Sequence, residues 1–227
     1  MGKIKDLKEQ ALATLRGKWG SFVGITFIYF LLVSIASGFS SYGTIFQGTN
    51  FSTLAVVCTS TGAILGLLMI PLAMGFSVAH LHASRQDLPA DPADLFYGYK
   101  NFWHVLGTYI LELLAVFAGF ILFLIPGIIL AFAYAMVPYI LRDHPELSIT
   151  ETLWTSRMMM KGHKWEFFVL ELSFIGWALL CILTLFIGYL WLIPYMQMTI
   201  AKFYEKIRAE YEGNGDNSMP KGNAEIA

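Results

Sequence analysis

The chain has 227 residues, of which 56% are hydrophobic and only 14% charged, with a formal net charge of −1 and a mean hydropathy of +0.60. A soluble domain carries about 25% charged residues, so this balance argues against a soluble protein and predicts a helical protein surrounded by lipid. Fifteen Lys and Arg residues in a few short stretches also argue against a nucleic-acid partner.

The first segment, Lys3 to Lys18, is predicted to be an amphipathic helix. Its apolar residues recur at helical spacing, at Leu7, Ala11 and Leu15. A signal peptide with a small-residue cleavage site near Ala36 is the alternative interpretation. The acidic residues and the periodicity of the segment favour a first span that stays attached as an anchor.

Six apolar stretches come close to the ~20 residues that a helix needs to cross a bilayer. They are Phe22–Phe39, Leu54–Val78, Val105–Ala118, Phe120–Leu141, Phe167–Ile187 and Tyr189–Phe203. The third stretch is short and the fourth follows it almost directly. This pair is therefore either a tight hairpin that turns near Gly119 or one bent segment that does not cross twice.

A repeated motif favours hairpins. The second member of each pair begins with Leu-x-(Met or Leu)-Ile-Pro, at residues 67–71, 122–126 and 190–194. Three copies of this motif predict an internal repeat.

The repeat units are predicted at about residues 5–85, 91–143 and 148–208. Each unit would consist of an amphipathic interfacial helix, a tryptophan, a span, a turn and a span with an early proline. We therefore predict an all-α membrane protein with six transmembrane helices, arranged as three hairpin repeats in a single domain over residues 1–211. The polar, Gly-rich segment 212–227 is predicted to be a disordered tail.

Two of the interfacial helices carry clear start signals. Asp91 followed by Pro92 is typical of an N-cap and first helical residue, and Ser148 with Glu151 is typical of a capping box. The tryptophans that precede the first members of the pairs are predicted to anchor at the membrane interface. These tryptophans are Trp19, Trp103 and Trp165.

The basic residues predict the orientation. They fall in the N-terminal segment, in 85–100, in 142–164 and from Lys202 onward, whereas the opposite turns carry none. Under the positive-inside rule, both termini and both long loops are cytoplasmic. The outer side would then show only residues 40–53 and tight turns around Gly119 and Gly188.

Glu112 and Glu171 are the candidate functional residues, because ionisable side chains inside spans are costly and often functional. They could serve as proton or cation sites, or each could simply be hydrogen-bonded within the helix bundle. The repeated prolines, Pro71, Pro126 and Pro194, are predicted to be helix kinks. Bent helices could alternatively border a central cavity, as in transporters.

No catalytic, cofactor-binding or metal-binding residues are predicted. Cys58 and Cys181 lie in apolar runs and are interpreted as small buried hydrophobic residues. His80 and His82 are two residues apart, so on a helix they point to different faces and are poor joint metal ligands. The sequence contains no phosphate-binding glycine loop or hydrolase motif.

The chain resembles a bacterial integral-membrane family catalogued as domain of unknown function 975. The most specific features are the run Met160-Lys161-Gly162-His163-Lys164-Trp165 and the late Pro194-Tyr195. The resemblance begins near Ile125, reaches Tyr204, and extends to Ala11, Leu12, Leu15 and Trp19. It implies a multi-pass bacterial membrane protein with no assigned activity and no catalytic residues.

The leading functional hypothesis is a structural or regulatory protein of the bacterial plasma membrane that interacts with lipids or other membrane proteins. The alternatives are a small transporter that uses Glu112 and the proline-bent helices, and a membrane-embedded enzyme acting on lipids. The sequence does not predict the oligomeric state.

Overall fold

The computed structural model describes residues 2–45 and 52–213. In these ranges the regular structure is helical and contains no strand, which confirms the predicted all-α class. Most of the predicted tail, from residue 214, lies outside the described residues. So does the central part of the predicted outer loop, residues 46–51.

The helices can be grouped along the chain into three sets. The elements are α1 (Gly2–Leu15), α2 (Trp19–Ile45) and α3 (Ser52–Gln86); the 3-10 helix η1 (Pro92–Asn101), α4 (Phe102–Leu122), α5 (Leu124–Tyr134) and α6 (Val137–Asp143); and α7 (Ile149–Met159), α8 (Lys164–Leu183) and α9 (Tyr189–Gly213). The predicted start signals are present. The Asp91 side chain accepts a hydrogen bond from the Ala93 amide, and Ser148 and Glu151 form a reciprocal capping box.

Five stretches of the described chain are long and apolar enough to cross a membrane: 19–38, 56–86, 92–122, 124–143 and 164–183. The sixth predicted span, Tyr189–Phe203, is not confirmed. It forms the first part of α9, in which charged residues begin at Lys202. The preceding part of α9 is only about 20 Å long at about 1.5 Å per residue, shorter than a bilayer core of about 30 Å.

The third and fourth stretches form a tight hairpin rather than one bent segment. The turn lies at Phe123, whose backbone is extended (φ −166°, ψ 158°), and not near Gly119 as predicted. Gly119 instead permits close packing of α4 on α5, because a Cβ atom there would lie 3.1 Å from the Cα atom of Gly127. A larger residue at Gly119 would therefore separate the two helices.

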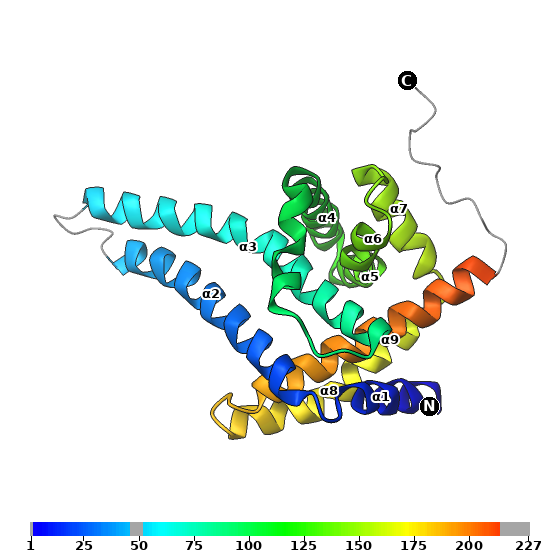
Figure 1. Cartoon of the computed structure of the whole chain (residues 1–227). Helices are drawn as coiled ribbons and strands as arrows, with labels where there is room; N and C mark the ends of the chain where they lie inside the picture. Colours follow the sequence, from blue (N-terminus) through cyan, green and yellow to red (C-terminus); the bar gives the residue numbers. More distant parts are fainter. Residues whose placement is uncertain (1, 46–51, 214–227) are drawn as a thin grey trace.

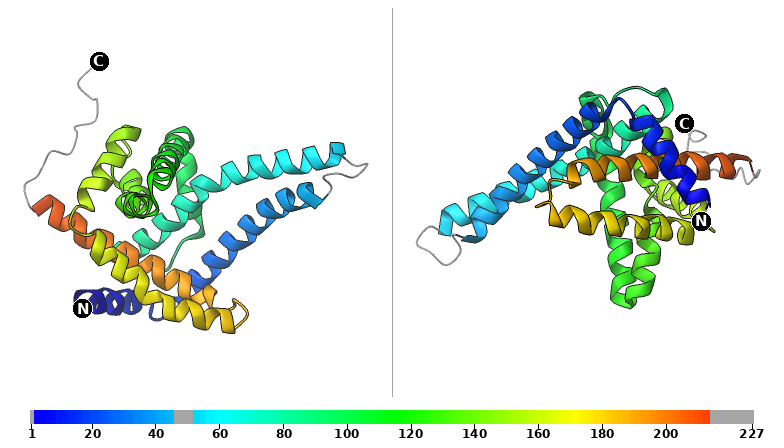
Figure 2. Two further views of the ribbon diagram at one scale, coloured as in Figure 1. Left: turned by 180° about the vertical axis from the view of Figure 1, so that it is seen from behind. Right: turned by 90° about the horizontal axis from the view of Figure 1, so that it is seen from below.

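The helix pairs diverge from a common base. Figure 1 shows α2 and α3 extending together away from the rest of the chain. In the views of Figure 2, the α4–α5 hairpin and the α8–α9 pair point in other directions. The predicted arrangement of three equivalent hairpins is therefore not confirmed.

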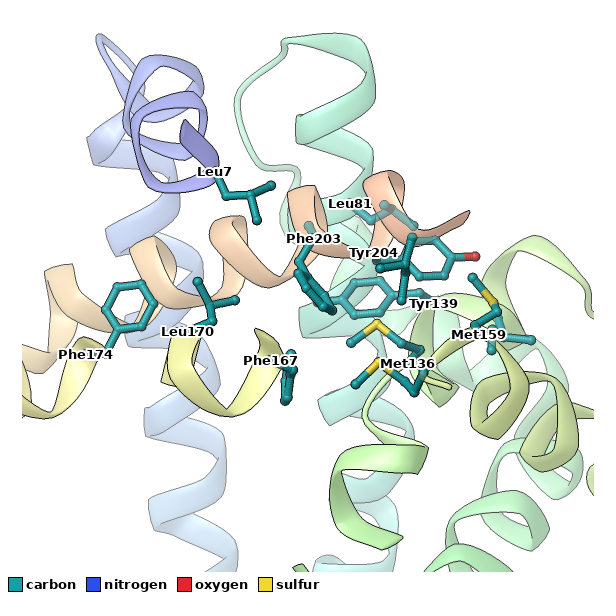
Figure 3. Close-up of a cluster of buried hydrophobic side chains, with 14 of the residues drawn as sticks. Leu7, Leu81, Met136, Tyr139, Met159, Phe167, Leu170, Phe174, Phe203 and Tyr204 are labelled. Atoms are coloured by element: carbon teal, nitrogen blue, oxygen red, sulfur yellow. The ribbon is translucent and has the colours of Figure 1, made fainter. Parts of the chain in front are cut away.

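The hydrophobic core lies at this base. One buried cluster joins side chains from α1, α3, α6, α7, α8 and α9 (Figure 3). Tyr139 of α6 and Tyr204 of α9 stack in it with their ring centroids 5.0 Å apart. Burying each large apolar side chain stabilises the fold by about 1.5–3 kcal/mol, so the base holds the diverging pairs together.

The parts of the pairs beyond the base expose large apolar side chains. Phe27 of α2, Leu113 of α4 and Leu179 of α8 are each more than half exposed. Continuous exposed apolar surface is unfavourable in water but matches a lipid environment. The described fold is thus that of a helical membrane protein with a buried base.

Candidate functional site: a charged junction at the base

The carboxylate of Asp143, at the end of α6, binds several donors from other helices. Arg85 donates from Nη1 and Nη2 to its two oxygens, both at 2.7 Å. Arg208 and Tyr204 donate to Oδ2 at 2.9 and 2.8 Å. The Asp143 side chain is only 5% exposed, so these charge-assisted hydrogen bonds replace the water that the carboxylate has lost.

Further ion pairs extend this set, which we call the Asp143 junction. Arg85 Nε donates to Glu205 at 2.7 Å, and Arg208 Nε donates to Glu212 at the same distance. Arg85 comes from α3, Asp143 from α6 and Arg208 from α9. The junction therefore ties together α3, α6 and α9, one helix from each of the three sets along the chain.

A second polar contact lies one residue before Asp143 in the chain. Arg142 Nε donates to His82 Nε2 at 2.9 Å, and His82 Nδ1 lies 3.0 Å from the Asp94 carboxylate. Because an arginine can only donate, Nε2 must be the acceptor and Nδ1 must carry the proton. This contact holds η1 against the ends of α3 and α6.

His80 and His82 have separate environments. His80 is fully buried, and its Nδ1 lies 2.8 Å from the carbonyl oxygen of Phe76 on its own helix. In residues 2–45 and 52–213, no group of three or more His, Cys, Asp or Glu side chains is arranged to hold a metal ion.

One ion pair and one helix cap, both outside the spans, lower the pKa values of carboxyl groups. Lys18, just before α2, donates to Asp87 at the end of α3, and this hydrogen bond lowers the pKa of the Asp87 carboxyl. The Ser148 hydroxyl and amide donate to Glu151 and lower its pKa in the same way. Both contacts favour the charged carboxylate and fix segments that border the base.

A polar cavity of about 530 Å³ adjoins the Asp143 junction. It lies between α1, the end of α3 and the charged part of α9. Its walls, which define what we call the charged cavity, are formed by Asp6, Leu7, Gln10, Ser84, Arg85, Lys202, Glu205, Lys206 and Glu210. The volume falls within the roughly 300–1,000 Å³ of small-molecule sites.

The structure places Glu112 on α4 and Glu171 on α8, away from the walls of the charged cavity. Glu112 Oε2 and Glu171 Oε1 are both buried and have no hydrogen-bond partner in the described part of the chain. No hydrogen bond or ion pair between described residues joins the two glutamates. Their role as a proton or cation site stays a prediction.

The repeated prolines occupy different positions in their helices. Pro71 and Pro194 lie inside α3 and α9. Pro126 lies in the first turn of α5, where a missing amide costs no helical hydrogen bond. None of the three lines the charged cavity.

The repeated tryptophans also differ from one another. Trp103 and Trp165 are strongly exposed at the starts of α4 and α8, as an interfacial anchor would require. Trp19 is half-buried and borders an apolar groove of about 370 Å³ beside α1, α8 and α9. Their depth in a membrane stays a prediction.

Sequence reasoning missed the Asp143 junction. Its members are ordinary charged residues at the cytoplasmic ends of predicted spans, where such residues are expected for topology alone. In the sequence, Asp143 differs from other charged residues only in its position, because it follows Arg142 at the end of an apolar span. Its partners lie 58 and 65 residues away, so their convergence depends on the tertiary fold.

The fold and junction define a multi-pass helical membrane protein whose helix pairs are fastened at one end. The family model described as "Protein of unknown function (DUF975)" matches residues 111–211, which confirms the resemblance expected from the sequence. The match does not reach the N-terminal positions Ala11 to Trp19, so that part of the resemblance stays a prediction. The comparisons with curated proteins and with solved structures gave no match.

Proposed function

We propose that the protein is a structural or regulatory component of the bacterial plasma membrane that acts by binding lipids or other membrane proteins. The Asp143 junction supports this role most directly. It fastens the bases of three helix pairs, while the pairs diverge and keep their apolar faces exposed. Such a shape offers lipid or a partner several separate apolar surfaces.

The junction is better suited to a structural role than to an enzymatic one. Asp143, Arg85 and Arg208 neutralise one another through short hydrogen bonds. A general acid or base must be free to exchange a proton with a substrate. The paired charges of the junction are better suited to holding the helices together.

The proposed topology has six crossings in three hairpin units, with both termini in the cytoplasm. The positive-inside rule supports this orientation, since the charged junction and the basic residues share one end of the fold. The sixth crossing would be made by α9, with its short apolar part tilted little and its Lys202 side chain reaching toward the interface.

Cysteine accessibility tests this topology in a background in which Cys58 and Cys181 are replaced by Ala. We expect cysteines at Tyr42, Phe123 and Leu183, all more than half exposed near the far ends of the pairs, to react from outside with an impermeant maleimide.

Cysteines at Asp87 and Gly213 should react only after the membrane is opened. Reaction of the Gly213 position from outside would show that α9 does not cross. Reaction of both the Asp87 and the Phe123 positions from the same side would show that α4, which lies between them, does not cross the membrane.

Transport is the second candidate, favoured by the buried and unpartnered carboxylate oxygens of Glu112 and Glu171. Intramembrane carboxylates of this kind serve as proton or cation sites in transporters. Glu112→Gln should leave the protein inserted and folded, and in a transporter it should abolish uptake into proteoliposomes. Unchanged ion or proton flux in this variant would remove Glu112 as the transport site.

A further inference from the structure

We propose that the turn between α7 and α8 binds the headgroup of an anionic phospholipid through the side chains of Arg157, Lys161 and Lys164. This inference rests on the proposed lipid-binding function and names the lipid class and the surface that recognises it. These three cations and the exposed Trp154 and Trp165 form what we call the basic patch. Three of the five residues belong to the Met-Lys-Gly-His-Lys-Trp run, which takes no part in the Asp143 junction.

Unpaired positive charge distinguishes the basic patch from the other charged groups at the base. In the described part of the chain, the side chains of Arg157, Lys161 and Lys164 make no hydrogen bond or ion pair. Arg85 and Arg208, by contrast, contact carboxylates at 2.7 and 2.9 Å. The basic patch therefore keeps positive charge that an anion can neutralise.

The nearest acidic residues along the chain are already engaged elsewhere. Glu166, which follows Lys164 by two residues, contacts Lys206 at 2.6 Å. Glu151, in the first turn of α7, accepts hydrogen bonds from the hydroxyl and the amide of Ser148. Residues 152–165 contain no acidic side chain. The three cations are thus not neutralised from within their own segment.

The turn between the helices also brings two of the cations close to each other. Gly162 has a left-handed backbone (φ +88°), which changes the direction of the chain between α7 and α8. Lys164, the first residue of α8, lies near enough to Arg157 to be repelled by its positive charge. A phosphate group bound to both would replace this repulsion with charge-assisted hydrogen bonds.

Helix α7 is packed so that the basic patch faces outward. It buries Leu153 and Met159 in the hydrophobic core. Trp154 and Arg157, three residues apart on the same helix, are both exposed. Lys161, just beyond the end of the helix, is exposed as well. An indole ring and two cations therefore share one side of this segment.

The surface of α8 favours a lipid over an acidic protein segment as the occupant. Trp165 is strongly exposed, and Leu172, Leu179 and Leu183 are exposed on the same face, because their spacings from Trp165 are close to whole helical turns. An apolar stripe therefore begins at the basic patch and follows α8. The acyl chains of a lipid bound at the patch would cover this stripe, and a tryptophan at headgroup depth is typical of a membrane interface.

Native mass spectrometry of the full chain in detergent tests the proposal. Equal amounts of phosphatidylglycerol and phosphatidylethanolamine would be added, and the lipid retained by the protein would be measured. We expect the wild type to retain phosphatidylglycerol preferentially. Equal retention, or a preference for phosphatidylethanolamine, would overturn the anionic site, whereas retention of lipid as such would still support the proposed function. Recovery of a soluble, lipid-free protein would instead contradict the proposed function itself.

Three substitutions remove the charges of the basic patch. Arg157→Gln, Lys161→Gln and Lys164→Gln should each weaken phosphatidylglycerol binding about fivefold, which corresponds to about 1 kcal/mol for one basic residue at an anionic lipid surface. The triple variant should lose most of the preference. Because the fold loses no side-chain hydrogen bond or ion pair at these positions, the triple variant should unfold at the wild-type temperature or slightly above it. An unchanged preference would overturn the lipid as the occupant of the patch.

A charge-matched control separates the basic patch from the general excess of basic residues at this end of the fold. Lys5→Gln, Arg16→Gln and Lys100→Gln together remove three exposed cations that lie outside the patch. This control variant should keep the wild-type preference for phosphatidylglycerol. Equal losses in the two triple variants would show that only total charge matters and would overturn a localised site.

A soluble competitor tests whether the acyl chains contribute to binding. Glycerol phosphate carries the anionic phosphate without acyl chains, so it should displace phosphatidylglycerol only weakly from the wild type. Displacement at concentrations comparable with that of the lipid would show that the patch binds a soluble anion, and it would overturn the lipid as the occupant.

Discussion

Replacing Asp143 with Asn should destabilise the protein strongly, because the variant leaves two arginines facing a neutral side chain. Breaking a buried ion pair by removing one partner costs about 3–5 kcal/mol. The side chains of Arg85 and Arg208 are 27% and 29% exposed, so both recover some contact with water. We therefore expect the lower end of this range, about 3 kcal/mol.

Glu146→Gln is the matched control for this variant. Glu146 lies three residues further along the chain, is 60% exposed and lies 3.1 Å from His144 Nδ1. Exposed pairs of this kind contribute about 0–1 kcal/mol. The free energy of unfolding would be measured by titrating detergent micelles with sodium dodecyl sulfate and following tryptophan fluorescence. If the Asp143 and Glu146 variants differed by less than 1 kcal/mol, the reasoning would be wrong.

A double-mutant cycle then isolates the contact between Asp143 and Arg85. Arg85→Gln alone leaves the Asp143 carboxylate with fewer donors, and the double variant removes both charges. Residues in direct contact show coupling energies of about 0.5–3 kcal/mol, and the bidentate geometry at 2.7 Å places this pair toward the upper end. Additive effects of the two substitutions would refute the direct contact.

Two further predictions concern helix packing and pH. Gly75→Ala should lower the free energy of unfolding by about 1–3 kcal/mol, because the new Cβ atom would overlap the carbonyl oxygen of Leu95. Gly66→Ala on the same helix has open space around its Cβ atom and should be neutral or slightly stabilising. Equal unfolding midpoints for the two variants would contradict the close approach of α3 and η1. For Glu151, the folded-state pKa lies below the ordinary value of 4.5, so its stabilisation is present above pH 4.5 and is lost as the pH falls through the folded pKa. The stability difference between the wild type and Glu151→Gln should therefore shrink below about pH 4.5, and a difference that grew on acidification would show that the sign is wrong.

The sequence predicted local features well because they depend on neighbouring residues. The capping box of Ser148 and Glu151 and the N-cap at Asp91 are defined within three residues, and both are present. Apolar runs likewise predicted the membrane class and five of the six stretches. Their arrangement in space was less predictable, since identical Leu-x-(Met or Leu)-Ile-Pro motifs place proline inside α3 and α9 but in the first turn of α5.

The candidate site was harder to predict from the sequence than the helices were. Glu112 and Glu171 were selected because an ionisable side chain inside the membrane is energetically costly. This criterion finds charged residues only when they lie deep within a span. Asp143 lies at a span end, where charge is inexpensive, and its burial results from side chains that other helices supply. Such a site can be recognised only once the helices are placed relative to one another.

The origin of the donors to Asp143 also sets an order of assembly during synthesis. Arg85 and Asp143 belong to α3 and α6, which precede α9 in the chain, so their bidentate contact can form before α9 is synthesised. Arg208 and Tyr204 lie on α9, so the carboxylate acquires its remaining donors only after α9 has been synthesised. A nascent chain that stops before α9 would therefore carry the Arg85–Asp143 pair without the hydrogen bonds that Arg208, Tyr204 and Glu205 add to it.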